Sequence, residues 1–88
     1  MKKDDLYAAL VALKNPKEAE AFLKDLCSEG ETGEMAARLK AAQLLDQGQT
    51  YTAVTEATGL SSTTIARVSL CLKRKGSGYA LLLKRLKS

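Results

Sequence analysis

The segment "YTAVTEATGLSSTTIARV", residues 51–68, holds two runs with helical spacing of apolar residues, separated by a single glycine. Thr50 precedes the first run, and either Ser61 or Ser62 begins the second. Hydroxyl side chains at such places accept hydrogen bonds from the first free backbone amides of a helix. Gly59 can adopt the left-handed backbone conformation that ends a helix and turns the chain. The pattern therefore predicts a short helix, a glycine turn and a second helix.

Two helices joined by a tight glycine turn match the helix-turn-helix, whose second helix lies in the major groove of DNA. The contacts that such a pair needs fall on aliphatic residues, with Val54 before the turn and Leu60, Ile65 and Val68 after it. A helix, a glycine turn and a helix also occur in many bundles that bind no DNA, so the turn alone is a weak signal. With the aliphatic positions, it predicts a helix-turn-helix at about residues 51–75.

The outward face of the predicted second helix is short near its beginning and basic towards its end. Short hydroxyl and methyl side chains let a helix end approach base edges and phosphates, and arginines neutralise phosphates. Leu70 is discordant, because it is an apolar residue on a face that is expected to contact DNA. The predicted DNA-binding residues are Thr52, Thr55, Ser61, Ser62, Thr63, Ala66, Arg67 and Arg74.

The charge of the chain is divided unevenly along its length. Residues 1–60 carry seven basic and ten acidic residues, a net charge of −3, whereas residues 61–88 carry seven basic residues and no acid, a net charge of +7. An acid-free basic segment attracts a polyanion, and nucleic acid is the commonest such partner. The alternative interpretation is a solvated basic tail.

The rest of the chain also has helical spacing of apolar residues, and no stretch alternates with period two, so we predict an all-α protein. Asn15 and Pro16 give a clear helix start, with Asn15 as the N-cap. A longer helix is expected from the late twenties to Gln47, although Gly30 and Gly33 weaken its beginning. The remaining expected helices contain Leu6, Leu10 and Leu13 near the start of the chain, and Leu82, Leu83 and Leu86 after the glycines at 76 and 78.

The 88 residues, of which 45% are apolar and 27% charged, fit one compact domain. Chains of this size bury only about 60 to 65% of their unfolded surface, so a core shared between two copies is a natural solution. No apolar run reaches the roughly 20 residues of a membrane span, and the first residues do not form a signal peptide. We expect a cytoplasmic protein with reduced thiols and no membrane contact.

The sequence offers no catalytic or metal-binding set. Histidine is absent, and Cys27 and Cys71 lack the paired spacing of a zinc site. There is no phosphate-binding glycine loop and no nucleophile motif, and the carboxylates are scattered. We therefore predict no enzyme activity and no metal.

Three stretches carry a resemblance to a known family: "ALVALKNPKEAEAFLKDLCS" at 9–28, "EMAARLKAAQLLDQGQTYTAVTEATGLSSTTIARVSLCL" at 34–72, and "GSGYALLLKRL" at 76–86. Together they resemble the tryptophan-repressor family, in particular its small YerC/YecD-type branch. The most specific part is "YTAVTEATGLSSTTIARV" preceded at a fixed distance by "AARLKAAQLL". The resemblance implies a six-helix fold and an intertwined homodimer that binds pseudo-palindromic DNA and usually represses transcription.

The resemblance also points to candidate effector-binding residues. Arg38 in "AARLK" and Arg67 in "IARV" match the two arginines that help hold tryptophan in the tryptophan repressor itself. Val68 stands where a small residue would leave room for the indole ring, and Cys71 replaces a serine. A branched valine fills that space, so we expect no cofactor and do not expect tryptophan as the corepressor. Arg38 is alternatively a solvated or dimer-bridging arginine.

These observations predict one DNA-binding domain over residues 1–88. It would be a sequence-specific regulator, most simply a repressor, whose partners are double-stranded DNA and a second copy of itself, with an unknown effector. The alternative is a helical interaction module without DNA binding. Such a module would dimerise or bind a protein through Leu70 and the terminal leucines, and the basic segment would serve solubility alone.

Overall fold

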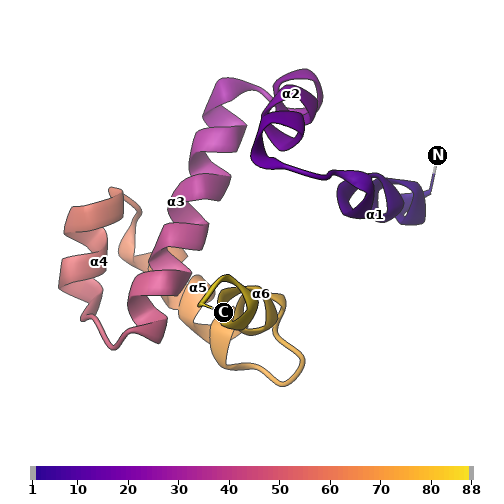
Figure 1. Ribbon diagram of the computed structural model, residues 1–88. Helices are drawn as coiled ribbons and strands as arrows, with labels where there is room; N and C mark the ends of the chain where they lie inside the picture. Colours follow the sequence, from indigo (N-terminus) through magenta and orange to yellow (C-terminus); the bar gives the residue numbers. More distant parts are fainter. Residues whose placement is uncertain (1, 88) are drawn as a thin grey trace. The chain divides into compact units, whose positions relative to one another are not determined.

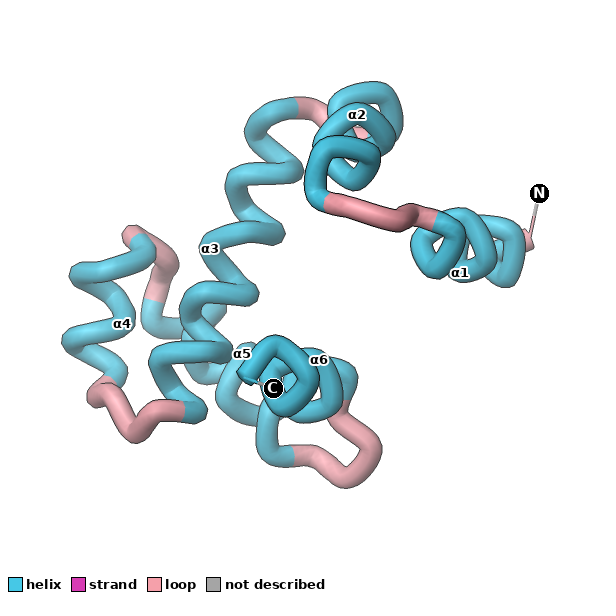
Figure 2. The backbone as a smooth tube through the Cα atoms, in the orientation of Figure 1, coloured by secondary structure: helices cyan, strands magenta, loops and turns pink. Residues whose placement is uncertain are grey.

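A computed structural model describes residues 2–87, which form six α-helices joined by short loops and contain no strand (Figures 1 and 2). This confirms the predicted all-α, six-helix fold. No helix within the described residues is long and apolar enough to cross a membrane. The helices are α1 (Lys3–Ala12), α2 (Pro16–Leu26), α3 (Glu29–Asp46), α4 (Tyr51–Thr58), α5 (Ser62–Lys73) and α6 (Gly78–Lys87).

The helices belong to two compact units, one up to Thr32 and one from Gly33 onward. The first unit contains α1, α2 and the beginning of α3, and the second contains the rest of α3 with α4, α5 and α6. No side chain between residues 2 and 32 is fully buried. The prediction of a single domain over residues 1–88 stays a prediction.

Side-chain caps begin α2 and α3. The Asn15 side chain accepts a hydrogen bond from the Glu18 amide at 2.9 Å, and Pro16 occupies the first helical position of α2, as predicted. At the start of α3 the Ser28 amide donates to the Glu31 carboxylate at 2.9 Å, and the Glu31 amide donates to the Ser28 hydroxyl at 3.1 Å. This reciprocal cap satisfies two otherwise free amides and supports a helix start that contains Gly30.

The Ser28 hydrogen bonds lower the pKa of the Glu31 carboxyl below its usual value. The lowered pKa means that the folded state favours the ionised carboxylate. The stabilisation is therefore present above the usual pKa of a glutamate and is lost as the pH falls through the lowered value.

The second unit is built around a small apolar core. The buried residues come from all four of its helices: Ala41 and Ala42 from α3, Val54 from α4, Ile65 and Val68 from α5, and Leu83 from α6. Leu60 is half-buried and packs against this core. The four aliphatic positions predicted to join the two helices of the helix-turn-helix therefore do face the same core, to which α3 contributes two small side chains.

The ends of α4 have the capping interactions predicted from the sequence. The Thr50 hydroxyl caps α4 by accepting a hydrogen bond from the Ala53 amide at 3.1 Å. Gly59 has φ 72° and its amide donates to the Thr55 carbonyl, which closes the helix. The predicted end of the second helix at about residue 75 is slightly late, because α5 ends at Lys73 and the backbone is extended at the next residue.

Gly33 and Gly59 both have room for a Cβ, so substituting them with alanine tests the effect of backbone conformation alone. Neither Gly33 nor Gly59 has an atom within 4 Å of the Cβ that alanine would add. Gly33→Ala should raise the free energy of unfolding by about 1 kcal/mol, because alanine favours the interior of α3. Gly59→Ala should lower it by about 1 to 2 kcal/mol, because the left-handed conformation strains alanine. Urea denaturation measures both, and changes of the same sign would contradict the assigned conformations.

Candidate nucleic-acid interface

The predicted DNA-binding residues all lie in the second unit, on α4, on α5 or at the ends of α5. Thr52 and Thr55 are exposed on α4. On α5 the buried side chains are Ile65, Val68 and Ser69, so the core side of this helix is well defined. Its exposed or half-exposed predicted residues are Ser62, Thr63, Ala66 and Arg67, with Ser61 and Arg74 as the two exposed cap residues. Ala66 is the least accessible of the set because it is half-buried.

The hydroxyl residues at the start of α5 have two different local roles. Of the two predicted capping residues, Ser61 is the N-cap: its Oγ accepts from the Thr64 amide at 3.1 Å, and it also bonds the Thr64 hydroxyl at 3.0 Å. The hydroxyls of Ser62 and Thr63 make no hydrogen bond within residues 2–87 and remain available to a partner. The amides at the beginning of a helix also attract anions such as phosphates.

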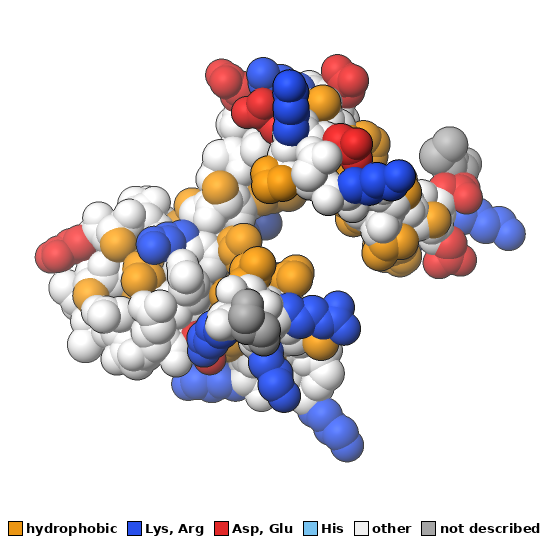
Figure 3. All heavy atoms as spheres, viewed as in Figure 1, with side chains coloured by type: hydrophobic (Ala, Val, Ile, Leu, Met, Phe, Trp, Pro, Cys, Tyr) orange, Lys and Arg blue, Asp and Glu red, His pale blue; other side chains and the backbone are white. Residues whose placement is uncertain are grey.

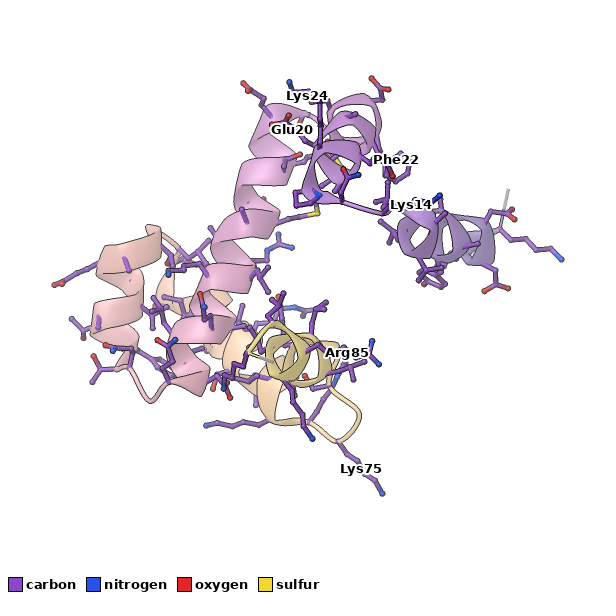
Figure 4. The ribbon with its side chains drawn as sticks, viewed as in Figure 1. Lys14, Glu20, Phe22, Lys24, Lys75 and Arg85 are labelled. Carbon is purple, nitrogen blue, oxygen red and sulfur yellow. The ribbon has the colours of Figure 1, made fainter. Side chains whose placement is uncertain are left out.

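The charges around α5 favour contact with a polyanion. Neither α5 nor α6 contains an acidic residue. Arg67, Arg74 and Lys75 form no ion pair within the described part of the chain, and Lys75 points away from the helices at the turn between α5 and α6 (Figure 4). On the face shown in Figure 3, basic side chains gather over α6 and the turn before it. Unpaired exposed cations of this kind can replace the counterions of DNA.

Leu70 remains discordant in the structure. Its side chain is 73% exposed and lies three residues from Arg67 and four residues from Arg74, which places it on the same face of α5. The sequence-based placement of Leu70 on the outward face is therefore consistent with its exposure. An exposed leucine beside two arginines suits either an apolar part of the DNA surface or a protein partner.

The two candidate effector-binding arginines meet at one cavity of about 500 Å³. The Arg38 guanidinium is held by the Glu34 carboxylate at 2.8 Å, and this hydrogen bond and ion pair raise the pKa of Arg38 above its ordinary value. Val68 lines the same cavity while its side chain belongs to the core, with only 2% exposed. The full lining is Arg38, Thr64, Arg67, Val68, Cys71 and Tyr79.

Tyr79 is a site residue that the sequence analysis did not single out. It lies in the first turn of α6, while the other lining residues come from α3 and α5. The available signal was an aromatic residue directly after the predicted glycine break at 76 to 78. Helical spacing alone could not show that its ring would reach the arginine pair.

No cluster of three or more metal-ligating side chains occurs within the described chain. Cys27 and Cys71 are both free thiols.

Comparisons with known proteins agree on one family. The family described as Trp repressor protein matches residues 2–87. The uncharacterized protein YerC of Bacillus subtilis (strain 168) is 37% identical over 84 residues, which cover 96% of this chain and 81% of YerC. The crystal structure of a TrpR like protein from Eubacterium eligens ATCC 27750 matches with a TM-score of 0.89 and 33% identity, over 96% of this chain and 87% of that one. A Staphylococcus aureus structure matches equally well, over 96% of this chain and 84% of the other.

The two serines at the start of α5 allow capping to be separated from any role in binding. Ser61→Ala should lower the free energy of unfolding by about 1 kcal/mol, because it removes the N-cap hydrogen bond. Ser62→Ala should change it by less than about 0.5 kcal/mol, because the hydroxyl is exposed and makes no hydrogen bond in the described chain. Thermal denaturation of both variants measures the difference. Equal losses of stability would contradict the assignment of Ser61 as the N-cap.

Proposed function

The chain belongs to the Trp repressor family, and from this premise we propose that it is a sequence-specific DNA-binding regulator that represses transcription. Members of this family are regulators rather than enzymes. In the proposed mechanism two copies bind a pseudo-palindromic operator through the helix-turn-helix and occlude a promoter. The cytoplasmic location predicted from the sequence belongs to the same proposal.

The observation that carries this proposal is the outward face of α5. Its first turn presents the unbonded hydroxyls of Ser62 and Thr63. Further along are the unpaired guanidinium groups of Arg67 and, at the C-cap, of Arg74. Short hydroxyls suit close approach to base edges, whereas arginines further along suit the phosphates on either side of a groove. Thr52 and Thr55 on α4 would contact the DNA backbone and so support the position of α5.

The proposed homodimer is supported by the apolar surface that a single chain leaves exposed. In the first unit Tyr7 and Val11 are 55% and 86% exposed, and in the second unit Leu81, Leu82 and Leu86 are each at least half exposed. The fully buried core of one chain is small by comparison. A second copy of the chain would cover these side chains and would present two α5 helices to two half-sites of a pseudo-palindrome.

We propose further that tryptophan is not the corepressor. The Val68 side chain is part of the packed core and also lines the cavity that holds Arg38 and Arg67. An indole ring in that cavity would compete with a branched side chain that cannot leave without opening the core.

The alternative function, a helical interaction module without DNA binding, is favoured by one observation. Leu70 and the leucines of α6 are exposed, and they could form a protein interface. A random-site DNA selection separates the two functions. Enrichment of a two-fold symmetric site supports the regulator, whereas a chain that enriches no sequence supports the module.

Thr63 and Arg67 should affect DNA binding in different ways. Arg67→Ala should weaken binding to the selected site and to random DNA alike, and should reduce the slope of log affinity against log salt by about 1 for each protomer. Thr63→Ala should weaken binding to the selected site by about 1 kcal/mol and leave binding to random DNA unchanged, because it removes a base-edge hydrogen bond. Fluorescence anisotropy over a salt series measures both effects.

Lys24→Ala is the control for this experiment, because it removes one positive charge from an exposed position on α2 (Figure 4). It should leave affinity and salt slope nearly unchanged. All variants should keep the mass of the unmodified assembly in light scattering. If Lys24→Ala and Arg67→Ala weakened binding equally, the interface would not be the face of α5.

A further inference from the structure

The turn between α5 and α6 fixes the first turn of α6 firmly. Gly76 has φ 76°, and the Ser77 amide donates to the Arg74 carbonyl at 3.2 Å. Ser77 is only 6% exposed, and its hydroxyl accepts from the Ala80 amide at 3.2 Å. A buried N-cap allows little freedom at the start of the helix that it begins. Tyr79, in this first turn, is therefore set in place by the backbone as well as by its own contacts.

The Tyr79 ring stands at the boundary between two cavities. It is half-buried and packs against the core of the second unit. One cavity, of about 500 Å³, contains the arginine pair, and the other, of about 380 Å³, is lined by Leu39, Arg74 and Leu82 among others. Cys71 of α5 and Tyr79 of α6 line both cavities. The two cavities therefore adjoin each other at Cys71 and Tyr79.

The contacts of α5 explain why this space matters. Within the second unit α5 packs mainly against α4 and α6. The α4 side is held by the core across the Gly59 turn, including Val54 and Ile65. From α6, Leu83 belongs to the core and Tyr79 packs against it, and Tyr79 lines the same two cavities as Cys71 of α5. Removing the Tyr79 ring would weaken the contact of α6 with the later turns of α5 and leave Leu83 as the buried apolar contact from α6.

We infer that Tyr79 is a positioning residue for α5, which acts as a built-in aromatic occupant and holds this helix in its DNA-binding orientation without a small molecule from solution. The inference rests on the proposed function, because it assigns a role in DNA binding to a residue that does not face the DNA. It also gives the cavity a role that needs no effector. An occupant supplied by the chain is always present, so DNA binding would be constitutive.

The test uses the full chain and the DNA site enriched by random selection. Tyr79→Ala should weaken binding to that site about tenfold or more, and Tyr79→Phe should stay within about threefold of the unmodified protein, because the ring rather than the hydroxyl fills the space. Adding p-cresol, which carries the phenol ring deleted in Tyr79→Ala and one methyl group more, should restore the affinity of this variant, as an engineered cavity can accept a small aromatic molecule. It should not change the affinity of the unmodified protein.

Tyr51→Ala is the matched control, because it removes the same ring from an exposed position on α4. Whatever its own effect on affinity, p-cresol should not reverse it. Nuclear magnetic resonance gives a readout without DNA: p-cresol should shift the signals of Arg67 and Cys71 in Tyr79→Ala and leave those of the unmodified protein in place. If Tyr79→Ala does not fold, Tyr79→Leu keeps apolar volume without the ring and should show the same weaker binding.

The outcomes separate the inference from the proposed function. An unmodified protein that binds no DNA would overturn both. Normal DNA binding by the unmodified protein together with normal binding by folded Tyr79→Ala or Tyr79→Leu would overturn the inference alone. So would a gain of about tenfold or more in the affinity of the unmodified protein when tryptophan or p-cresol is added, because the occupant would then come from solution.

Discussion

The packing of Val54 against the core residues of α5 across the Gly59 turn is the constraint on which the second unit depends. Gly59 takes a left-handed conformation that a larger residue adopts only with strain, and the turn brings Ile65 and Val68 to the side of α5 that meets α4 and α3. Once that side is buried, the opposite side of α5 must face outward. The polar and basic face of this helix is therefore a consequence of how its aliphatic residues are spaced.

Much of this arrangement could be predicted from the sequence because its causes are local. A hydroxyl or amide side chain caps the amides three residues away, so Asn15 and Thr50 were readable as helix starts. The aliphatic positions around the turn were also readable, because helical spacing decides which side chains share a face. The choice between Ser61 and Ser62 could not be predicted, because either serine can cap a helix and only the backbone geometry selects Ser61.

The cavity beside α5 was the part that sequence reasoning could not assemble. The family resemblance marked Arg38 and Arg67 as a pair, and the structure brings both to one cavity. Tyr79 escaped notice because its place depends on the buried cap at Ser77 and on packing between α3, α5 and α6, which no local pattern encodes. For the predicted DNA-binding residues, the structure gives the positions of the side chains, whereas their contacts depend on a partner.

Val68 and Tyr79 both line the cavity that contains the arginine pair. Val68 contributes to the core and narrows the cavity, and Tyr79 supplies an aromatic ring at the boundary with the neighbouring space. A regulator whose DNA-binding helix is positioned by an aromatic effector needs an open cavity in which the effector binds. A chain that fills part of this space with its own side chains removes the dependence on a ligand and, with it, one means of control.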